Sequence, residues 1–236
     1  MFNVPAVVLS TIALLVLIEA GREWLLTDEE NNTFLLYFAF IPARYTELYP
    51  GGLGAQVWTF LTYALLHAGF VHVGVNSIWF LPFGSAMARR FGTWRFLGFC
   101  AITAIAGAAL HLLTHLYDPL PMIGASAAVS GVMAGSLRFV FQSGGPLAMF
   151  RHNDDAAYRV PAASLAVALR DPRIIIFLVA WFGLNLLFGI GAPSLPGIEQ
   201  SVAWQAHIGG FIAGLILFAL FDPVPPHAET DPAGPA

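Results

Sequence analysis

The chain has 236 residues, of which 58% are hydrophobic and 10% are charged, and its mean hydropathy is +0.73. This composition excludes an ordinary soluble domain and indicates a protein that crosses a membrane several times. The formal net charge is −4 and all ten basic residues are arginines, with no run that could follow a phosphate backbone, so we expect no nucleic-acid partner. Cys100 is the only cysteine, which leaves neither an internal disulfide nor a cysteine-based metal site.

Six apolar segments are long enough to span a bilayer as helices, which takes about 20 residues each. Their approximate limits are 5–26, 70–90, 94–116, 124–142, 172–190 and 201–221. The first has no positively charged leader and continues to Glu19 and Arg22, so we expect a retained span rather than a cleaved signal peptide. The sequence therefore predicts an all-α domain of six transmembrane helices over residues 1–221. The Pro-rich tail, 222–236, is predicted to be disordered.

The distribution of arginines predicts how the chain is oriented in the membrane. Most arginines lie between the second and third spans or beside the segment between the fourth and fifth: Arg89, Arg90, Arg95, Arg138, Arg151, Arg159, Arg170 and Arg173. The positive-inside bias then places both chain ends in the cytoplasm. The outward loops are 27–58, 117–123 and 191–200. We expect the aromatic-rich first loop to lie partly in the headgroup region, and the stretch 143–171 to be a flexible cytoplasmic connection that could include one surface helix.

Polar side chains inside such segments are costly and therefore need a reason. The second, fourth and sixth spans all begin at the outer side, and they carry polar residues near that end: His72, Asn76, Ser126 and His207. We expect these side chains to meet. Ser126 and His207 form a candidate catalytic dyad, in which the imidazole takes the hydroxyl proton. His72 and Asn76 are four residues apart, hence on one helical face, and both could donate to a developing negative charge.

Glycines in two of these spans indicate that their backbones can approach closely. Gly131 and Gly135 in the fourth span, and Gly210 and Gly214 in the sixth, each form a small-xxx-small pattern. A dyad across this pair of helices is sterically plausible. No aspartate or glutamate lies near either candidate residue in the sequence, so a triad with a carboxylate is not predicted.

These residues resemble the motifs of the rhomboid family of intramembrane serine proteases. Gly124-Ala125-Ser126 is similar to the family's Gly-x-Ser nucleophile motif, and His72-x-x-x-Asn76 is similar to its His-x-x-x-Asn motif. Ala206-His207-x-x-Gly210-x-x-x-Gly214 resembles its Ala-His-x-x-Gly-x-x-x-Gly motif, and the approach from Trp58 to His67 is also similar. The resemblance covers roughly residues 56–215.

The resemblance implies a six-helix fold whose water-filled cavity opens to the outer face. It implies that Ser126 is the nucleophile and His207 the base, with the Ser126 backbone N–H, His72 and Asn76 stabilising the oxyanion. The implied partners are the lipid bilayer and substrates with a single transmembrane helix that unwinds easily, cleaved near the membrane surface without a cofactor. We expect a bacterial plasma membrane.

Three positions depart from the family pattern: Ala127 replaces a common glycine, Ser130 stands where an aromatic residue often packs on the catalytic histidine, and Thr59 stands where arginine is frequent. Two rival functions therefore stay open. One is a rhomboid-like protein that binds or escorts transmembrane helices without cutting them, and the other is a small-solute channel or transporter.

Other interpretations of single residues are structural. Ser126 could be a small packing residue, and the Ser130 hydroxyl is expected to bond to a backbone carbonyl. An α/β-hydrolase elbow is rejected because alanine occupies position 128, where that motif needs glycine. His67, His111 and His115 are interpreted as structural or interfacial rather than as metal ligands, because no carboxylate accompanies the spaced pair. Glu19 and Asn185 are interpreted as interhelical polar contacts or snorkelling groups.

Overall fold

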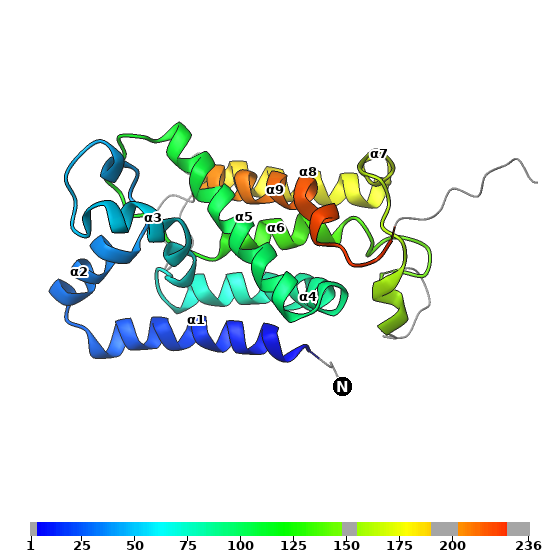
Figure 1. The fold of residues 1–236 in the computed structure, drawn as a ribbon, viewed down its shortest axis with the longest axis horizontal. Coiled ribbons are helices and arrows are strands. Elements are labelled where there is room, and N and C mark those ends of the chain that lie inside the picture. Colours follow the sequence, from blue (N-terminus) through cyan, green and yellow to red (C-terminus); the bar gives the residue numbers. More distant parts are fainter. Residues whose placement is uncertain (1–3, 148–154, 190–202, 226–236) are drawn as a thin grey trace, which may run out of the picture.

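The computed structural model describes residues 4–147, 155–189 and 203–225 (Figure 1). These residues form helices and turns with no strand, and the one extended pairing among them is an isolated antiparallel bridge between Phe40 and Met122. The predicted all-α class is therefore confirmed for the described part of the chain. The predicted outer loop 191–200 and most of the predicted tail lie outside it.

Nine α-helices lie within the described ranges. Their bounds are α1 Ala6–Leu25, α2 Asp28–Phe38, α3 Gly52–Thr62, α4 Phe70–Phe91, α5 Thr93–Thr114, α6 Ser126–Ser136, α7 Leu165–Ala168, α8 Pro172–Gly189 and α9 Trp204–Phe221. Short 3-10 helices are η1 Pro42–Tyr45, η2 Tyr63–Leu65 and η3 Asp155–Arg159. Figure 1 shows α6 in the middle of the bundle, with α1 along the lower edge and α2 and α3 gathered at the left end.

The predicted spans coincide with helices to different degrees. Helices α1, α4, α5, α8 and α9 match five of the predicted segments within a few residues, whereas the fourth segment contains α6, which has only 11 residues. Among the described residues, α5 and α9 are each long and apolar enough to cross a membrane. The segment from α3 to α4 passes the same criterion as a pair bent by 80°. The total of six spans thus stays a prediction.

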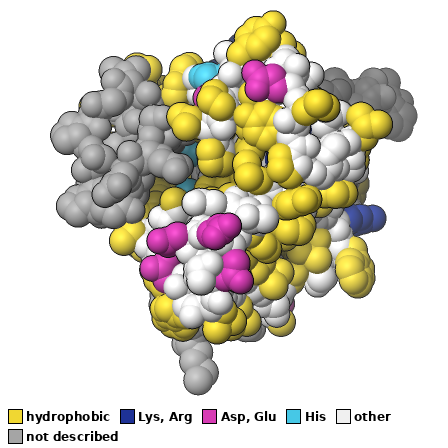
Figure 2. All heavy atoms as spheres, turned by 90° about the vertical axis from the view of Figure 1, so that its left-hand side faces the viewer, with side chains coloured by type: hydrophobic (Ala, Val, Ile, Leu, Met, Phe, Trp, Pro, Cys, Tyr) yellow, Lys and Arg dark blue, Asp and Glu magenta, His cyan; other side chains and the backbone are white. Residues whose placement is uncertain are grey.

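The first predicted outer loop contains two helices that the sequence analysis did not anticipate. Helix α2 begins at a capping box, in which the Glu30 backbone N–H donates to the Thr27 hydroxyl and the Glu30 carboxylate accepts from the Thr27 N–H at 2.8 Å. Acidic residues in the first turn also oppose the positive end of the helix dipole. Figure 2 looks at this end of the molecule and shows acidic side chains gathered on an otherwise largely uncharged face.

Helix α6 forms the centre of the core, because every residue from Ala127 to Ser136 is buried. Its neighbours are α4, α5 and α9. A methyl group on Gly210 or Gly214 of α9 would collide with a backbone carbonyl of α6, at Ala127 or Gly131 respectively. The two helices can therefore pack backbone to backbone only because these positions are glycine.

The glycines of α6 allow side chains of α4 and α5 to pack directly against its backbone. A methyl group on Gly131 would collide with Thr103 of α5, and one on Gly135 would lie 2.9 Å from Met87 of α4 and 3.1 Å from Phe99 of α5. The small residues of α6 thus admit neighbours on several sides at once, and this close packing holds its first residue in place within the bundle.

The predicted tail begins at Asp222, and this residue is anchored to the bundle. Its carboxylate forms a buried ion pair with Arg90 at the end of α4, with a separation of 2.8 Å. The backbone N–H of Asp222 also donates to the Phe218 carbonyl at the end of α9. The chain therefore stays attached beyond the predicted last span, and residues 226–236 lie outside the described part.

Candidate active site

Ser126 and His207 lie together although 81 residues separate them in the chain. Ser126 is the first residue of α6 and His207 lies in the first turn of α9. The Ser126 Oγ is 2.7 Å from the His207 Nε2, which is a normal length for a hydrogen bond. The fold thus brings together the two residues that the sequence analysis proposed as a dyad.

The turn that leads into Ser126 is held by backbone hydrogen bonds. Met122 exchanges two bonds with Phe40, and the Gly124 N–H donates to the Tyr63 carbonyl at 3.0 Å. Gly124 has a φ of +128°, a conformation that residues with a side chain rarely adopt. The glycine of the Gly-x-Ser motif is therefore needed for the backbone path that starts α6 at the serine.

A second hydrogen bond orients the imidazole of His207. Its Nδ1 is 2.5 Å from the Oδ1 of Asn185 on α8, and the Asn185 Nδ2 donates to the Trp181 carbonyl at 2.8 Å. Because the amide nitrogen of Asn185 is used by Trp181, its oxygen faces His207 and accepts. The hydrogen bonds therefore assign the proton of a neutral His207 to Nδ1, which leaves Nε2 able to accept the Ser126 hydroxyl proton.

The sequence predicts Asn185 only as an interhelical contact or a snorkelling group. The structure shows that it is an interhelical contact whose partner is the candidate base itself. The signal available in the sequence was an asparagine within an apolar segment, where an unpaired amide is costly. That signal indicates that a partner exists but does not identify it.

His72 faces the space beside the serine. Its Nδ1 accepts a hydrogen bond from the Ala68 backbone N–H at 3.2 Å, so a neutral His72 carries its proton on Nε2. A methyl group on Gly124 would lie 2.9 Å from that Nε2 and 3.7 Å from the Ser126 Oγ. An N–H donor thus points to a space next to the hydroxyl, which is the geometry that stabilises an oxyanion.

Asn76 lies one turn further along α4 and is buried. Its Nδ2 donates to the His72 backbone carbonyl at 3.0 Å, so one amide hydrogen is used within its own helix. Ser130, the competing hydroxyl on α6, donates to the Ser126 carbonyl at 2.7 Å. This bond is the backbone contact expected for Ser130 from the sequence.

Among the described residues, three further histidines form contacts outside the candidate dyad. His67 is fully buried, accepts a long hydrogen bond from the Ala125 N–H at 3.4 Å, and lies with its ring 5.0 Å from that of His72. The rings of His111 and His115 stack at 4.6 Å. Within the described ranges, no group of three or more histidine, cysteine or acidic residues is arranged to hold a metal ion.

Glu19 and Arg22 of α1 hold the loop before α4. The Glu19 carboxylate accepts from the Gly69 N–H at 2.7 Å, and Arg22 donates to the His67 carbonyl at 2.6 Å while pairing with Glu19 at 3.0 Å. Glu19 is buried and bonds to Gly69 directly before α4, so it joins α1 to the start of α4 and does not snorkel. This network supports the loop from which His72 follows.

Comparison with known proteins places these residues in one family. The family model of the Rhomboid domain matches residues 54–223. Rhomboid protease GluP of Bacillus subtilis is 26% identical over 162 residues, covering 69% of this chain and 25% of GluP. RHOMBOID-like protein 4 of Arabidopsis thaliana is 29% identical over 164 residues, covering 70% of this chain and 34% of that protein.

A third relative, the Bacillus subtilis protein YdcA, is 36% identical over 169 residues, covering 71% of this chain and 68% of YdcA. The chain thus spans only a quarter of GluP and a third of the Arabidopsis protein. The matched region nevertheless contains His72, Ser126, Asn185 and His207. Since the family model matches well over half of the chain and includes its candidate site, this protein belongs to the rhomboid family.

Proposed function

We propose that this rhomboid-family membrane protein is an intramembrane serine endopeptidase that cleaves transmembrane helices of other membrane proteins. The observation that carries the proposal is the 2.7 Å contact between the Ser126 hydroxyl and the His207 Nε2. A serine hydroxyl is a weak nucleophile unless an adjacent base takes its proton. The bond from His207 to Asn185 supports this role, because it leaves Nε2 as the acceptor.

In the proposed reaction, the Ser126 Oγ attacks the carbonyl carbon of the scissile peptide bond while its proton passes to the His207 Nε2. The resulting imidazolium gives that proton to the leaving nitrogen as the C–N bond breaks, which releases an amine and leaves an acyl-enzyme. A water molecule then gives a proton to His207 and attacks the ester. Collapse of the second intermediate returns the proton to the Ser126 oxygen and releases the new carboxyl terminus.

The developing oxyanion needs donors placed before the reaction begins. The Ser126 backbone N–H is available because it belongs to the first residue of α6, where no helical acceptor precedes it. The His72 Nε2–H is the second donor. Asn76 is the third proposed donor, through the amide hydrogen that its bond to the His72 carbonyl leaves unused.

The proposal includes the membrane arrangement expected from the sequence. The domain over residues 1–221 would span the membrane six times, both chain ends would lie in the cytoplasm, and the membrane would be a bacterial plasma membrane. The site would then lie below the outer surface, reached by substrate helices that unwind locally. Water must enter as well, because the second half of the reaction consumes one molecule per bond cleaved.

The departures Ala127 and Ser130 had motivated the rival function of a helix-binding protein without protease activity. The methyl group of Ala127 is buried in an apolar cluster with Ala104 and Ala206, which weakens the steric argument against turnover. Ser130 leaves the imidazole without an aromatic neighbour from α6, but Asn185 holds it from α8. These two observations favour the protease over the escort protein.

The test is labelling of the purified, detergent-solubilised protein with a serine-reactive fluorophosphonate, together with cleavage of a model transmembrane substrate in proteoliposomes. Ser126→Ala and His207→Ala are expected to abolish both signals. Ser130→Ala is the matched control and should keep them, because its hydroxyl bonds only to a backbone carbonyl. A folded parent protein that neither labels nor cleaves would overturn the proposal and favour helix binding; solute flux that persists in Ser126→Ala would favour a channel or transporter.

A further inference from the structure

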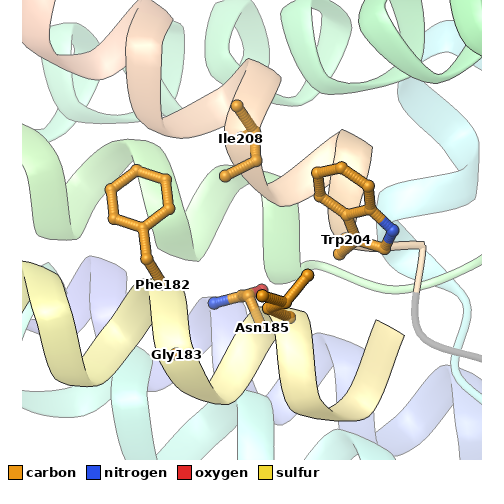
Figure 3. A pocket seen from close by; sticks show the side chains of 6 residues that line it. Phe182, Gly183, Asn185, Trp204 and Ile208 are labelled. Carbon is orange, nitrogen blue, oxygen red and sulfur yellow. The ribbon is translucent and has the colours of Figure 1, made fainter. Parts of the chain in front are cut away.

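We propose that Asn185 is a positioning residue, which holds His207 in the tautomer and orientation that a general base for Ser126 requires. This inference rests on the proposed protease function, which it deepens by adding a third member to the site. Figure 3 shows Asn185 on α8, beside a pocket that Trp204 and Ile208 of α9 also line. The geometry gives it a neutral version of the orienting role that an aspartate has in serine-protease triads.

The amide of Asn185 is oriented by its own helix. The Nδ2 donates to the Trp181 carbonyl at 2.8 Å, and the residue is only 9% exposed. If the amide flipped, its oxygen would face the Trp181 carbonyl oxygen, and a buried amide oxygen placed against another acceptor is costly. The Trp181 contact therefore keeps the Asn185 oxygen directed at His207.

The direction of this oxygen determines which nitrogen of His207 is the base. An oxygen at 2.5 Å from Nδ1 requires the proton there, and Nε2 is then an acceptor for the Ser126 hydroxyl. The opposite tautomer would place a proton on Nε2, where it would face the hydroxyl and could not accept from it. The single bond from Asn185 thus selects the reactive form of the imidazole.

The space between α8 and α9 beside Asn185 is not closely packed. A cavity of about 240 Å³ lies between α8 and α9, lined by Phe182, Gly183, Asn185, Leu186, Trp204 and Ile208. On α6, the side chain one turn after Ser126 is the small Ser130, whose hydroxyl is turned to a backbone carbonyl. The hydrogen bond from Asn185 therefore restrains the imidazole without help from a bulky side chain on α6.

The position of Asn185 is itself fixed by aromatic contacts between the two helices. The ring of Trp181 stacks on that of Phe211 of α9, with centroids 4.5 Å apart and planes inclined by 27°. Phe182 contacts the same ring edge-on at 5.7 Å. Offset and edge-on aromatic pairs are favourable arrangements, so α8 and α9 keep a defined register at the level of the amide.

The kinetic test compares three variants of the full chain on a transmembrane substrate. Asn185→Leu keeps the side-chain size but removes the hydrogen bond, and kcat is expected to fall on the order of 100-fold with KM changed less than about twofold. Asn185→Asp keeps an acceptor for the Nδ1 proton and should recover about tenfold or more of that loss. Leu184→Ala, on the exposed face of the same helix, is the matched control and should behave as the parent.

A second measurement does not depend on activity. In protein labelled with ¹⁵N-histidine, the His207 signals can be assigned among the seven histidines by their loss in His207→Gln. The parent is expected to show a protonated Nδ1 and an unprotonated Nε2, and Asn185→Leu should shift both signals toward the average of the two tautomers.

The two measurements separate the two proposals. A parent that carries its proton on Nε2, or an Asn185→Leu variant with unchanged tautomer and kcat, would overturn the role of Asn185. A parent with the expected tautomer that fails to label or cleave would overturn the protease function and leave in place only the contact by which Asn185 sets the His207 tautomer.

Discussion

Gly210 of α9 lies in backbone contact with Ala127 of α6, directly beside the Ser126–His207 pair. A methyl group on Gly210 would collide with the Ala127 carbonyl, and no side-chain rotation can relieve a clash with backbone. The two helices would have to separate, which would also separate the hydroxyl from the imidazole. This close approach therefore links the stability of the bundle to the geometry of the site.

We accordingly expect Gly210→Ala to lower the free energy of unfolding by about 3 kcal/mol and to abolish fluorophosphonate labelling. Denaturant titration in detergent measures the first effect, and the labelling rate of the folded fraction measures the second. Gly21→Ala is the control, because Gly21 lies within α1 and a methyl group there contacts nothing within 4 Å. Equal stability of the Gly210 variant and the parent would contradict the packing argument.

A second prediction concerns the buried ion pair that holds the end of α9 to α4. Arg90 donates to both carboxylate oxygens of Asp222, at 2.9 and 2.8 Å, and its guanidinium lies 4.6 Å from the ring centre of Phe139. Arg90→Met is expected to lower the free energy of unfolding by about 3–5 kcal/mol, because the Asp222 carboxylate would remain buried without the Arg90 guanidinium that pairs with it.

A second ion pair, formed by the adjacent residue Arg89 of α4, provides the control for this prediction. Arg89 pairs with Asp155 at 2.5 Å, but the Asp155 side chain is 81% exposed. Water screens such a pair, so Asp155→Asn should change the free energy of unfolding by about 1 kcal/mol or less. Similar effects from Arg90→Met and Asp155→Asn would show that burial does not decide the strength of these pairs.

A third prediction concerns pH and the start of α2, outside the predicted spans. The Glu30 carboxylate accepts hydrogen bonds from the backbone N–H and hydroxyl of Thr27, which hold the pKa of Glu30 below its ordinary value of 4.5. Since the folded pKa is depressed, this stabilisation is fully present above pH 4.5 and is lost as the pH falls through the folded value.

Below pH 4.5, the amide protection at the start of α2 should therefore decrease. Hydrogen exchange, corrected for intrinsic rates, measures this protection. In Glu30→Gln the side chain still accepts hydrogen bonds but does not titrate, so its protection should be independent of pH in this range. If Glu30→Gln lost amide protection with the same pH profile as the parent, the pH dependence would have to come from another titrating group.

The long helices could be predicted from apolar runs of about 20 residues, and local signals at helix ends agree with the observed bounds. Helix α4, for example, begins after Gly69 and ends before Gly92, and both glycines have positive φ. Helices α2 and α3 do not stand out in the sequence, because each has only 11 residues, too few for a span, and α2 is largely polar. The capping box at Thr27 and Glu30 was the available signal for α2.

The predicted fourth segment ran to residue 142, but α6 ends at Ser136. The apolar character of the sequence continues past this point, so composition alone could not place the end. The chain leaves the helix where Arg138 donates to the Ala163 carbonyl, a tertiary contact with a distant segment. Such a contact depends on the assembled fold and has no local signature.

The candidate site shows the same division between local and tertiary information. Ser126, His207 and His72 could be proposed from motifs, since each motif combines a reactive group with the glycine or spacing it requires. The tautomers of the two histidines could not, because each follows from a hydrogen bond to a group elsewhere: the Ala68 N–H for one and the Asn185 oxygen for the other.

The last prediction concerns Gly124, which combines a positive φ with close contact to His72. A methyl group on Gly124 would strain the backbone and lie 2.8 Å from the His72 Cε1, so it would displace the proposed oxyanion donor. Removing one such donor lowers kcat by about 100-fold or more, and we expect both Gly124→Ala and His72→Ala to have effects of this order.

A double-mutant cycle separates this displacement from strain. Once His72 is alanine there is no ring to displace, so adding Gly124→Ala should reduce kcat/KM little further. Gly92→Ala is the control for strain, because Gly92 has a φ of +74° and a methyl group there contacts nothing within 4 Å. If the double variant lost the product of the two single losses, Gly124 would act on catalysis independently of His72, and the space between them would not be the oxyanion site.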